Sequence, residues 1–146
     1  MIGSGSAWPG KIRDLRVLVV EDEDIMQTMI EYALNAISVK RITRAPNGSK
    51  ALGVLDLADE PFDLIICDWV MPIMDGLTFL RQFRARQYET RFLMLTGKAT
   101  AGAVGEAIGA GANSYIAKPF EVDDFHRKIK SVMNNPADSY HRRGAR

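Results

Sequence analysis

The sequence has little of several features that mark particular classes of protein. It holds one cysteine, Cys67, which excludes an intramolecular disulfide and a multi-cysteine metal site. No apolar run approaches the roughly 20 residues of a transmembrane helix, and the first residues lack the basic and apolar regions of a signal peptide. Basic residues exceed acidic ones by a single charge and are not clustered as a DNA-binding surface requires. These absences predict a cytoplasmic protein that neither spans a membrane nor binds DNA.

What is present is the composition of a globular domain, with 47% apolar and 25% charged residues in a chain of 146. Short apolar segments alternate with segments of helical periodicity, five of each. The predicted strands lie at 17–20, 39–44, 64–67, 92–95 and 114–116. Such alternation predicts a doubly wound α/β domain, (βα)5, with a parallel five-stranded sheet and helices on both faces. After the first strand, the spacing of Ile25, Met29, Tyr32, Ala33 and Ala36 predicts an amphipathic helix.

The chain is expected to form one domain with two short extensions. Residues 1–13, rich in glycine and serine at their start, predict a flexible lead-in, and residues 14–134 form the globular part. The tail, 135–146, carries three arginines and one aspartate, and leaves no room for an output domain. We expect this basic tail to be either a solvated end or an arm that binds an anionic ligand, since arginine matches phosphate oxygens.

Polar residues follow the predicted strands at the point where each one ends. They are Glu21 and Asp22 after the first strand, Asp68 after the third, Thr96 after the fourth and Lys118 after the fifth. In open parallel sheets, ligands bind beyond the carboxyl ends of the strands. We therefore expect these side chains to form one site.

The residue types at this site predict phosphoryl chemistry. Three converging carboxylates repel one another, and a divalent cation removes the conflict. A few oxygen ligands suit Mg²⁺, which completes its shell with waters and phosphate oxygens; Mn²⁺ could take its place. Lys118 and the Thr96 hydroxyl suit phosphoryl oxygens. Asp68 is the best nucleophile candidate, because a carboxylate can form an aspartyl-phosphate.

Four segments, VLVVEDE, CDWVMPIMDG, LTGKA and SYIAKPF, resemble in their order and spacing the receiver domain of bacterial two-component response regulators. The resemblance covers about residues 14–134. It implies a flavodoxin-like fold with strand order 2-1-3-4-5. It also implies that Asp68 is the phosphoacceptor and that Mg²⁺ is bound by Glu21, Asp22, Asp68 and the backbone carbonyl of Val70.

The resemblance implies roles for the remaining residues as well. Lys118, before a cis bond to Pro119, would pair with the phosphoryl group. Thr96 and Tyr115 would be a switch pair that reshapes the face formed by the fourth helix, fifth strand and fifth helix. Val70 and Lys98 occupy positions that tune dephosphorylation. Because an apolar and a cationic side chain cannot readily activate water, we expect slow loss of phosphate.

The implied function is a stand-alone, chemotaxis-type response regulator: a signalling module and not an enzyme in the ordinary sense. Its partners would be a histidine kinase or a histidine phosphotransfer protein, and an output protein that docks on the reshaped face. It would be a monomer or a phosphorylation-dependent dimer. Alternatives are a phosphorelay intermediate, a phosphate sink, and a small-substrate phosphatase of the same topology. The phosphatase is disfavoured because such enzymes usually carry an acid at the position of Val70.

Overall fold

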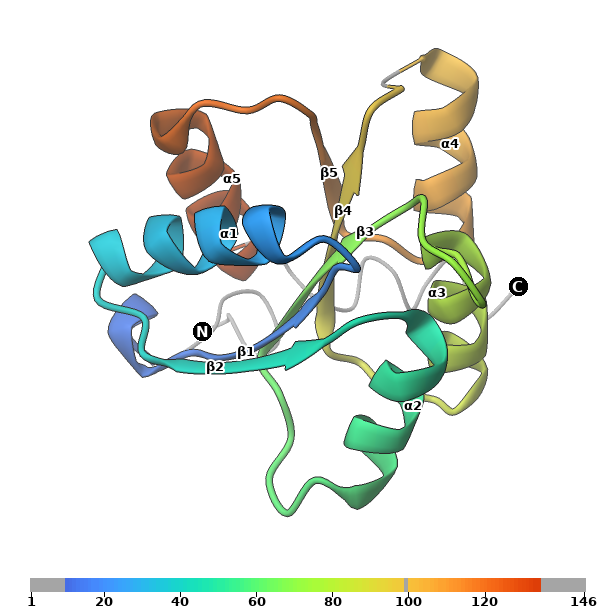
Figure 1. Ribbon diagram of the computed structural model, residues 1–146, viewed down its shortest axis with the longest axis horizontal. Coiled ribbons are helices and arrows are strands. Elements are labelled where there is room, and N and C mark those ends of the chain that lie inside the picture. Colours follow the sequence, from blue (N-terminus) through green and yellow to red (C-terminus); the bar gives the residue numbers. More distant parts are fainter. Residues whose placement is uncertain (1–9, 99, 135–146) are drawn as a thin grey trace, which may run out of the picture.

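The computed structural model describes residues 10–98 and 100–134. The predicted basic tail and most of the predicted lead-in lie outside these ranges. Its strands are β1 (Arg16–Val20), β2 (Arg41–Ala45), β3 (Leu64–Asp68), β4 (Arg91–Thr96) and β5 (Ser114–Ala117). Its helices are α1 (Asp24–Ala36), α2 (Gly48–Leu57), α3 (Gly76–Ala85), α4 (Ala101–Ala110) and α5 (Val122–Asn134), preceded by a short 3-10 helix, η1 (Ile12–Asp14). All strand pairs are parallel, and their order, β2-β1-β3-β4-β5, confirms the predicted fold (Figure 1).

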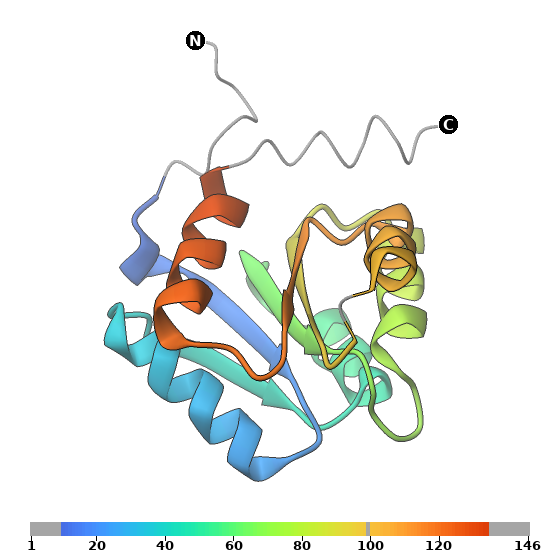
Figure 2. The same cartoon turned by 90° about the horizontal axis from the view of Figure 1, so that it is seen from above.

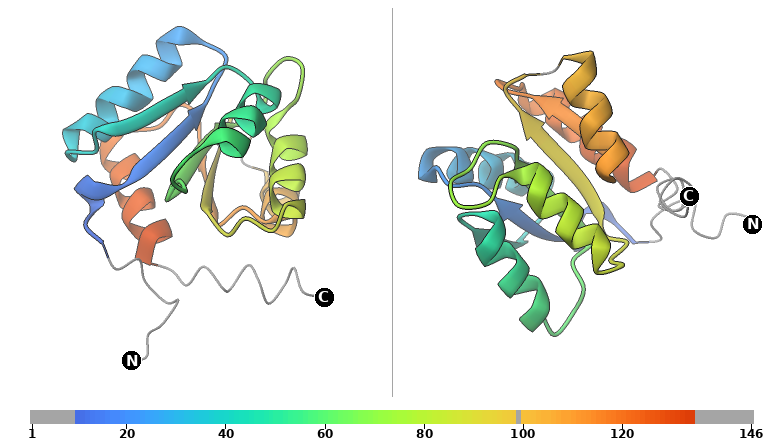
Figure 3. Two further views of the ribbon diagram at one scale, coloured as in Figure 1. Left: turned by 90° about the horizontal axis from the view of Figure 1, so that it is seen from below. Right: turned by 90° about the vertical axis from the view of Figure 1, so that its right-hand side faces the viewer.

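The sheet is buried between two layers of helices. Helices α1 and α5 cover one face, and α2, α3 and α4 lie side by side over the other (Figures 2 and 3). Alternate residues of each central strand enter opposite cores. In β1, Val17 and Val19 pack with α1 and α5, whereas Leu18 and Val20 pack with the other three helices. Because both faces of the central strands are buried, their sequences are continuous apolar runs.

Local signals set where several helices begin. Asn47, Asp75 and Thr100 each accept a hydrogen bond from the backbone N–H three residues later, at 2.9, 2.8 and 3.1 Å. These side chains are the N-caps of α2, α3 and α4, and they satisfy backbone donors that have no partner within the helix. None of the helices in the described ranges is long and apolar enough to cross a membrane.

The amphipathic helix predicted after the first strand is present as α1, but the apolar residues that predicted it do not form its buried face. Ile25, Met29 and Tyr32 are 79%, 49% and 72% exposed, and only Ala33 of the predicted set is buried. The face that packs on the sheet instead contains Gln27, Ile30, Ala33 and Leu34. Two faces of this helix carry apolar side chains at helical spacing, so periodicity alone cannot identify the one that meets the sheet. The exposed side chains of α1 are therefore available to another molecule.

Candidate functional site

Three carboxylates meet at the carboxyl end of the sheet, where they were predicted. Glu21 and Asp22 follow β1, Asp68 ends β3, and these two strands are neighbours. One ligand oxygen from each side chain lies within 4.8 Å of the others. Glu21 and Asp68 are buried, with 1% and 5% of their surface exposed, and Asp22 faces solvent. The cluster is thus a half-buried acidic site that is open on one side.

Lys118 joins the cluster from the end of β5. Its Nζ lies 3.1 Å from Asp68 Oδ2 and 3.8 Å from Glu21 Oε1. The backbone N–H of Lys118 donates to the Thr96 carbonyl at 2.7 Å, and the peptide to Pro119 is cis, as predicted. The ammonium therefore stands over the central carboxylate, at the position from which it would contact a group attached to Asp68.

The carboxyl group of Glu21 has a perturbed pKa. Burial raises its pKa from 4.5 to about 7, with a smaller contribution in the same direction from the charge of Asp68. A hydrogen bond from the Glu23 N–H to Oε2, 3.1 Å long, opposes this shift. Among the described residues, Glu21 Oε1 is buried and makes no hydrogen bond. A buried carboxylate oxygen that accepts no hydrogen bond, with only the Lys118 ammonium 3.8 Å away as an ion-pair partner, is suited to a cation, which would complete its coordination.

A buried glutamine fixes the chain that carries the acid pair. Gln27 in α1 donates from Nε2 to the carbonyls of Val19 and Glu21 at 3.1 Å, and to that of Ala45 at 3.4 Å. The Glu21 N–H donates in turn to the Ala45 carbonyl at 3.0 Å. The ends of β1 and β2 and the loop after them are thereby joined by one amide. Sequence reasoning missed this residue, because nothing local distinguishes a buried glutamine from a solvated one.

A glycine lets α3 begin close to the central carboxylate. A Cβ at Gly76 would lie 2.4 Å from the backbone oxygen of Asp68 and 2.9 Å from the Cα of Trp69, both far below ordinary contact. The Gly76 N–H donates to the Trp69 carbonyl at 2.7 Å, which closes the loop after β3. The segment CDWVMPIMDG ends on this glycine. The sequence therefore shows the glycine, but not that it lies against the backbone of Asp68.

The Thr96 hydroxyl is engaged by its own loop. It donates to the Lys98 carbonyl at 3.0 Å and accepts from the Lys98 N–H at 2.9 Å. Thr96 is buried at the end of β4, beside the end of β3 that carries Asp68. The structure thus brings Thr96 to the site, but its hydroxyl is used within the loop and would have to exchange these bonds to reach a group on Asp68.

The other predicted residues lie in the loops and strands next to the acidic cluster. Val70 is 76% exposed, and with Trp69, Thr96, Lys98 and Ala103 it lines a cavity of about 440 Å³. Val70 and Lys98, the two residues predicted to tune dephosphorylation, therefore line the same open space. Tyr115 is half-buried in β5, where it packs against the core on the α2, α3 and α4 side. Burial raises the pKa of the Cys67 thiol well above its ordinary value, which agrees with a structural role.

The donor set fits a hard divalent cation. Carboxylate oxygens are the ligands that Mg²⁺ prefers, and it commonly takes one or two from the protein and keeps several waters. The Glu21 oxygen that accepts no hydrogen bond and the exposed carboxylate of Asp22 favour the same chemistry. In the described part of the chain, no thiolate or imidazole belongs to this cluster, so the soft ligands favoured by zinc are missing.

Comparison with known proteins gives consistent matches. A family model described as "Response regulator receiver domain" matches residues 17–130. The chemotaxis protein CheY of Pseudomonas aeruginosa is 32% identical over 121 residues, which cover 82% of this chain and 96% of that protein. CheY of Bacillus subtilis is 32% identical over 119 residues, covering 82% and 98%. The structure of Vibrio cholerae CheY4 aligns with a TM-score of 0.72 at 30% identity, covering 80% of this chain and 96% of that one.

Proposed function

This chain belongs to the response regulator receiver domain family, and on that premise we propose that it is a signalling module controlled by phosphorylation of Asp68. The observation that carries the proposal is the pairing of Lys118 Nζ with Asp68 Oδ2 at 3.1 Å, inside a cluster of three carboxylates. An ion pair between Lys118 and Asp68 that only stabilised the fold would not need Glu21 and Asp22 beside it. A phosphoryl site does, because they hold the cation that offsets the charge of the incoming group.

The proposed transfer follows from this placement. An oxygen of Asp68 attacks the phosphorus of a phosphohistidine, the P–N bond breaks, and its electron pair returns to the imidazole of the donor. Glu21 and Asp22, with the Val70 carbonyl, would hold Mg²⁺, which supplies positive charge to the phosphoryl oxygens when bound. Lys118 exchanges part of its contact with Asp68 for a contact with the phosphoryl group. Each group acts on charge that develops during the transfer.

The switch in this proposal uses Thr96 and Tyr115. The phosphoryl group on Asp68 attracts the Thr96 hydroxyl, which gives up its two bonds to the Lys98 backbone. The loop after β4 then moves toward Asp68, and the half-buried Tyr115 ring moves further inward. The face formed by α4, β5 and α5 changes as a result, and an output protein that distinguishes the two forms reads the signal.

Exposed apolar side chains near the acid cluster support a macromolecular phosphodonor. Ile25, Met29 and Tyr32 lie on the solvent side of α1, which begins two residues after Asp22. Val70 and Ile73, 76% and 83% exposed, lie in the loop after β3. Exposed apolar surface next to a functional site can serve as an interaction surface, and we assign these side chains to docking of a histidine kinase or a histidine phosphotransfer protein. The cytoplasmic location remains a prediction from the sequence.

The decisive experiment is phosphorylation of the purified protein. We expect acetyl phosphate with Mg²⁺ to add one phosphoryl group, measured by mass spectrometry, and the Asp68→Asn variant to remain unmodified. Trp69, half-buried beside the acceptor, should report the same event by fluorescence. Glu23→Gln is the matched control, because Glu23 lies beside the acid pair but outside the cluster. Modification that persists in Asp68→Asn, or none in the wild type, would contradict the proposal.

A further inference from the structure

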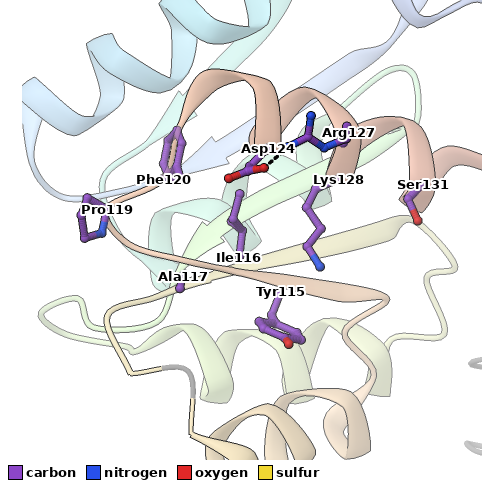
Figure 4. Close-up of a pocket in the computed structure, with 9 residues that line it drawn as sticks. All are labelled: Tyr115, Ile116, Ala117, Pro119, Phe120, Asp124, Arg127, Lys128 and Ser131. Atoms are coloured by element: carbon purple, nitrogen blue, oxygen red, sulfur yellow. Dashed lines mark hydrogen bonds and ion pairs between the residues drawn. The ribbon is translucent and has the colours of Figure 1, made fainter.

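Tyr115 lies against a lysine of the last helix. Lys128 in α5 places its Nζ 4.7 Å from the centroid of the Tyr115 ring. Figure 4 shows both side chains on the wall of a cavity of about 490 Å³ lined by residues of β5 and α5. A cation within about 6 Å of a ring centroid is attracted by the negative face of the ring. The contact is therefore a cation–π pair between α5 and the side chain proposed to switch.

Within the described ranges, the Tyr115 ring is the group with which the Lys128 ammonium interacts. The neighbouring Arg127 forms an ion pair with Asp124 one turn earlier, as Figure 4 also shows. Lys128 forms no ion pair with a carboxylate among the described residues, and it is half-buried rather than fully solvated. Its charge is thus directed at Tyr115, whereas the charge of Arg127 is already compensated.

The pair lies where it can affect the switch. Tyr115 is opposite Met94 in the register of β4 and β5, two residues before the pair Thr96 and Ala117. In the arrangement seen here, the Thr96 hydroxyl is bound to the Lys98 backbone, so the loop after β4 has not moved toward Asp68. The cation–π pair therefore exists together with the unswitched position of Thr96.

We propose that Lys128 is a positioning residue that holds the Tyr115 ring in this place and so opposes the inward movement. The inference rests on the proposed function, because that movement matters only if Asp68 accepts a phosphoryl group. A contact present in one of two positions shifts the equilibrium between them by its own strength. For an exposed cation–π pair, the shift is about two- to fivefold. Lys128 would thus set the threshold of the switch without touching the phosphoryl group.

Three variants test this assignment. Lys128→Gln removes the cation, Lys128→Arg keeps a cation that can lie over the ring, and Lys130→Gln removes the same charge from an exposed position of α5. The first measurement is the NMR shift of the Lys128 ε-protons, which the ring should move upfield and Tyr115→Leu should restore. The second is the affinity for beryllium fluoride with Mg²⁺, followed by Trp69 fluorescence.

We expect Lys128→Gln to bind beryllium fluoride about two- to fivefold more tightly than the wild type, and Lys128→Arg and Lys130→Gln to bind as the wild type does. Equal affinities of Lys128→Gln and Lys130→Gln would overturn the proposal, as would the absence of an upfield shift. The proposed function and the proposed role of Lys128 can be refuted by different results. A wild type that takes no beryllium fluoride would refute the proposed function and the coupling to it, whereas the NMR shift tests the contact in either case.

Discussion

At the scale of single residues, Glu21 is a carboxyl group held away from water. Its side chain is buried beside Asp68, and burial raises its pKa to about 7. In the metal-free protein it therefore holds a proton through the acidic range. A bound divalent cation needs the ionised form, so binding must release that proton.

This proton sets a pH dependence. We expect the apparent affinity for Mg²⁺ to rise about tenfold per pH unit below pH 7 and to level off above it. The metal-free protein should lose stability as pH rises from about 4.5 to about 7, because there the folded form binds the proton more tightly than the unfolded chain. Mg²⁺ titrations followed by Trp69 fluorescence on both sides of pH 7 check the first expectation. A Glu21→Gln variant should lose the slope; a slope that persists would contradict the assignment.

Val70 and Lys98, at the two positions expected to tune dephosphorylation, lead to a prediction of how long the phosphoryl group remains. Val70 has no hydrogen-bonding atom in its side chain and is 76% exposed, and Lys98 is cationic, so neither can act as a base toward water. We expect slow intrinsic dephosphorylation, measured as loss of mass after removal of acetyl phosphate. Val70→Asn should shorten the lifetime and Ile73→Asn, an exposed neighbour in the same loop, should not. A lifetime of only seconds in the wild type would contradict the prediction.

At the scale of elements, α4 is the least buried helix of the α2, α3 and α4 layer. Ala107 is its one fully buried residue. Its C-terminal end is anchored by Arg84 of α3, which donates to the Gly111 carbonyl from Nε and Nη2 at 3.1 and 2.9 Å. Its first turn follows the Thr96–Lys98 loop. An element fixed at one end and weakly packed along its length is suited to movement at the other end.

The glycines of α4 predict that this helix can be stiffened. Gly102, Gly105 and Gly109 have open space where a Cβ would lie, so replacement by alanine should stabilise the helix by up to about 1 kcal/mol at each site. Thermal unfolding measures this gain. Gly76→Ala is the contrasting control and should be destabilising, because its Cβ would lie 2.4 Å from the Asp68 backbone oxygen. A loss of stability in the α4 variants would contradict the inference that a Cβ fits at these three positions without displacing its neighbours.

At the scale of the whole molecule, the order of the sheet assembles the site. Placing β1 beside β3, with β4 and β5 following, brings four loops to one edge. Residues 21, 68, 96 and 118 are far apart in the chain, yet they meet there because parallel strands end on the same side. A cation bound at this edge joins β1 to β3, and so contributes to the stability of the entire fold.

Mg²⁺ should therefore raise the unfolding temperature. A ligand present at about 100 times its dissociation constant stabilises the folded state by about 2.7 kcal/mol. We expect thermal melts in MgCl₂ to exceed those in NaCl of equal ionic strength, and the difference to vanish in Asp22→Asn. Asp22 is exposed, so this substitution should leave the metal-free fold intact. An unchanged Mg²⁺ effect in Asp22→Asn would remove that carboxylate from the proposed ligands.

The sequence by itself determined the architecture and the members of the acidic site. Apolar runs such as 64–67 predict strands buried on both faces, and a parallel sheet then requires the acids after β1 and β3 to meet. These features follow from local chemistry and from the geometry of parallel strands. The switch roles of Thr96 and Tyr115 and the Val70 carbonyl ligand stay predictions, since their test lies in the phosphorylated protein.

Only the tertiary structure decided which neighbours these elements meet. It showed that α1 packs through Ile30 and Leu34 and leaves Tyr32 exposed, that the Gln27 amide joins three carbonyls, and that Lys128 lies over Tyr115. The physical reason is the same in each case. A helix with apolar residues on two sides, a buried polar residue within a helix, or a lysine in the middle of one has several satisfactory environments. The packing of the other elements selects one of them.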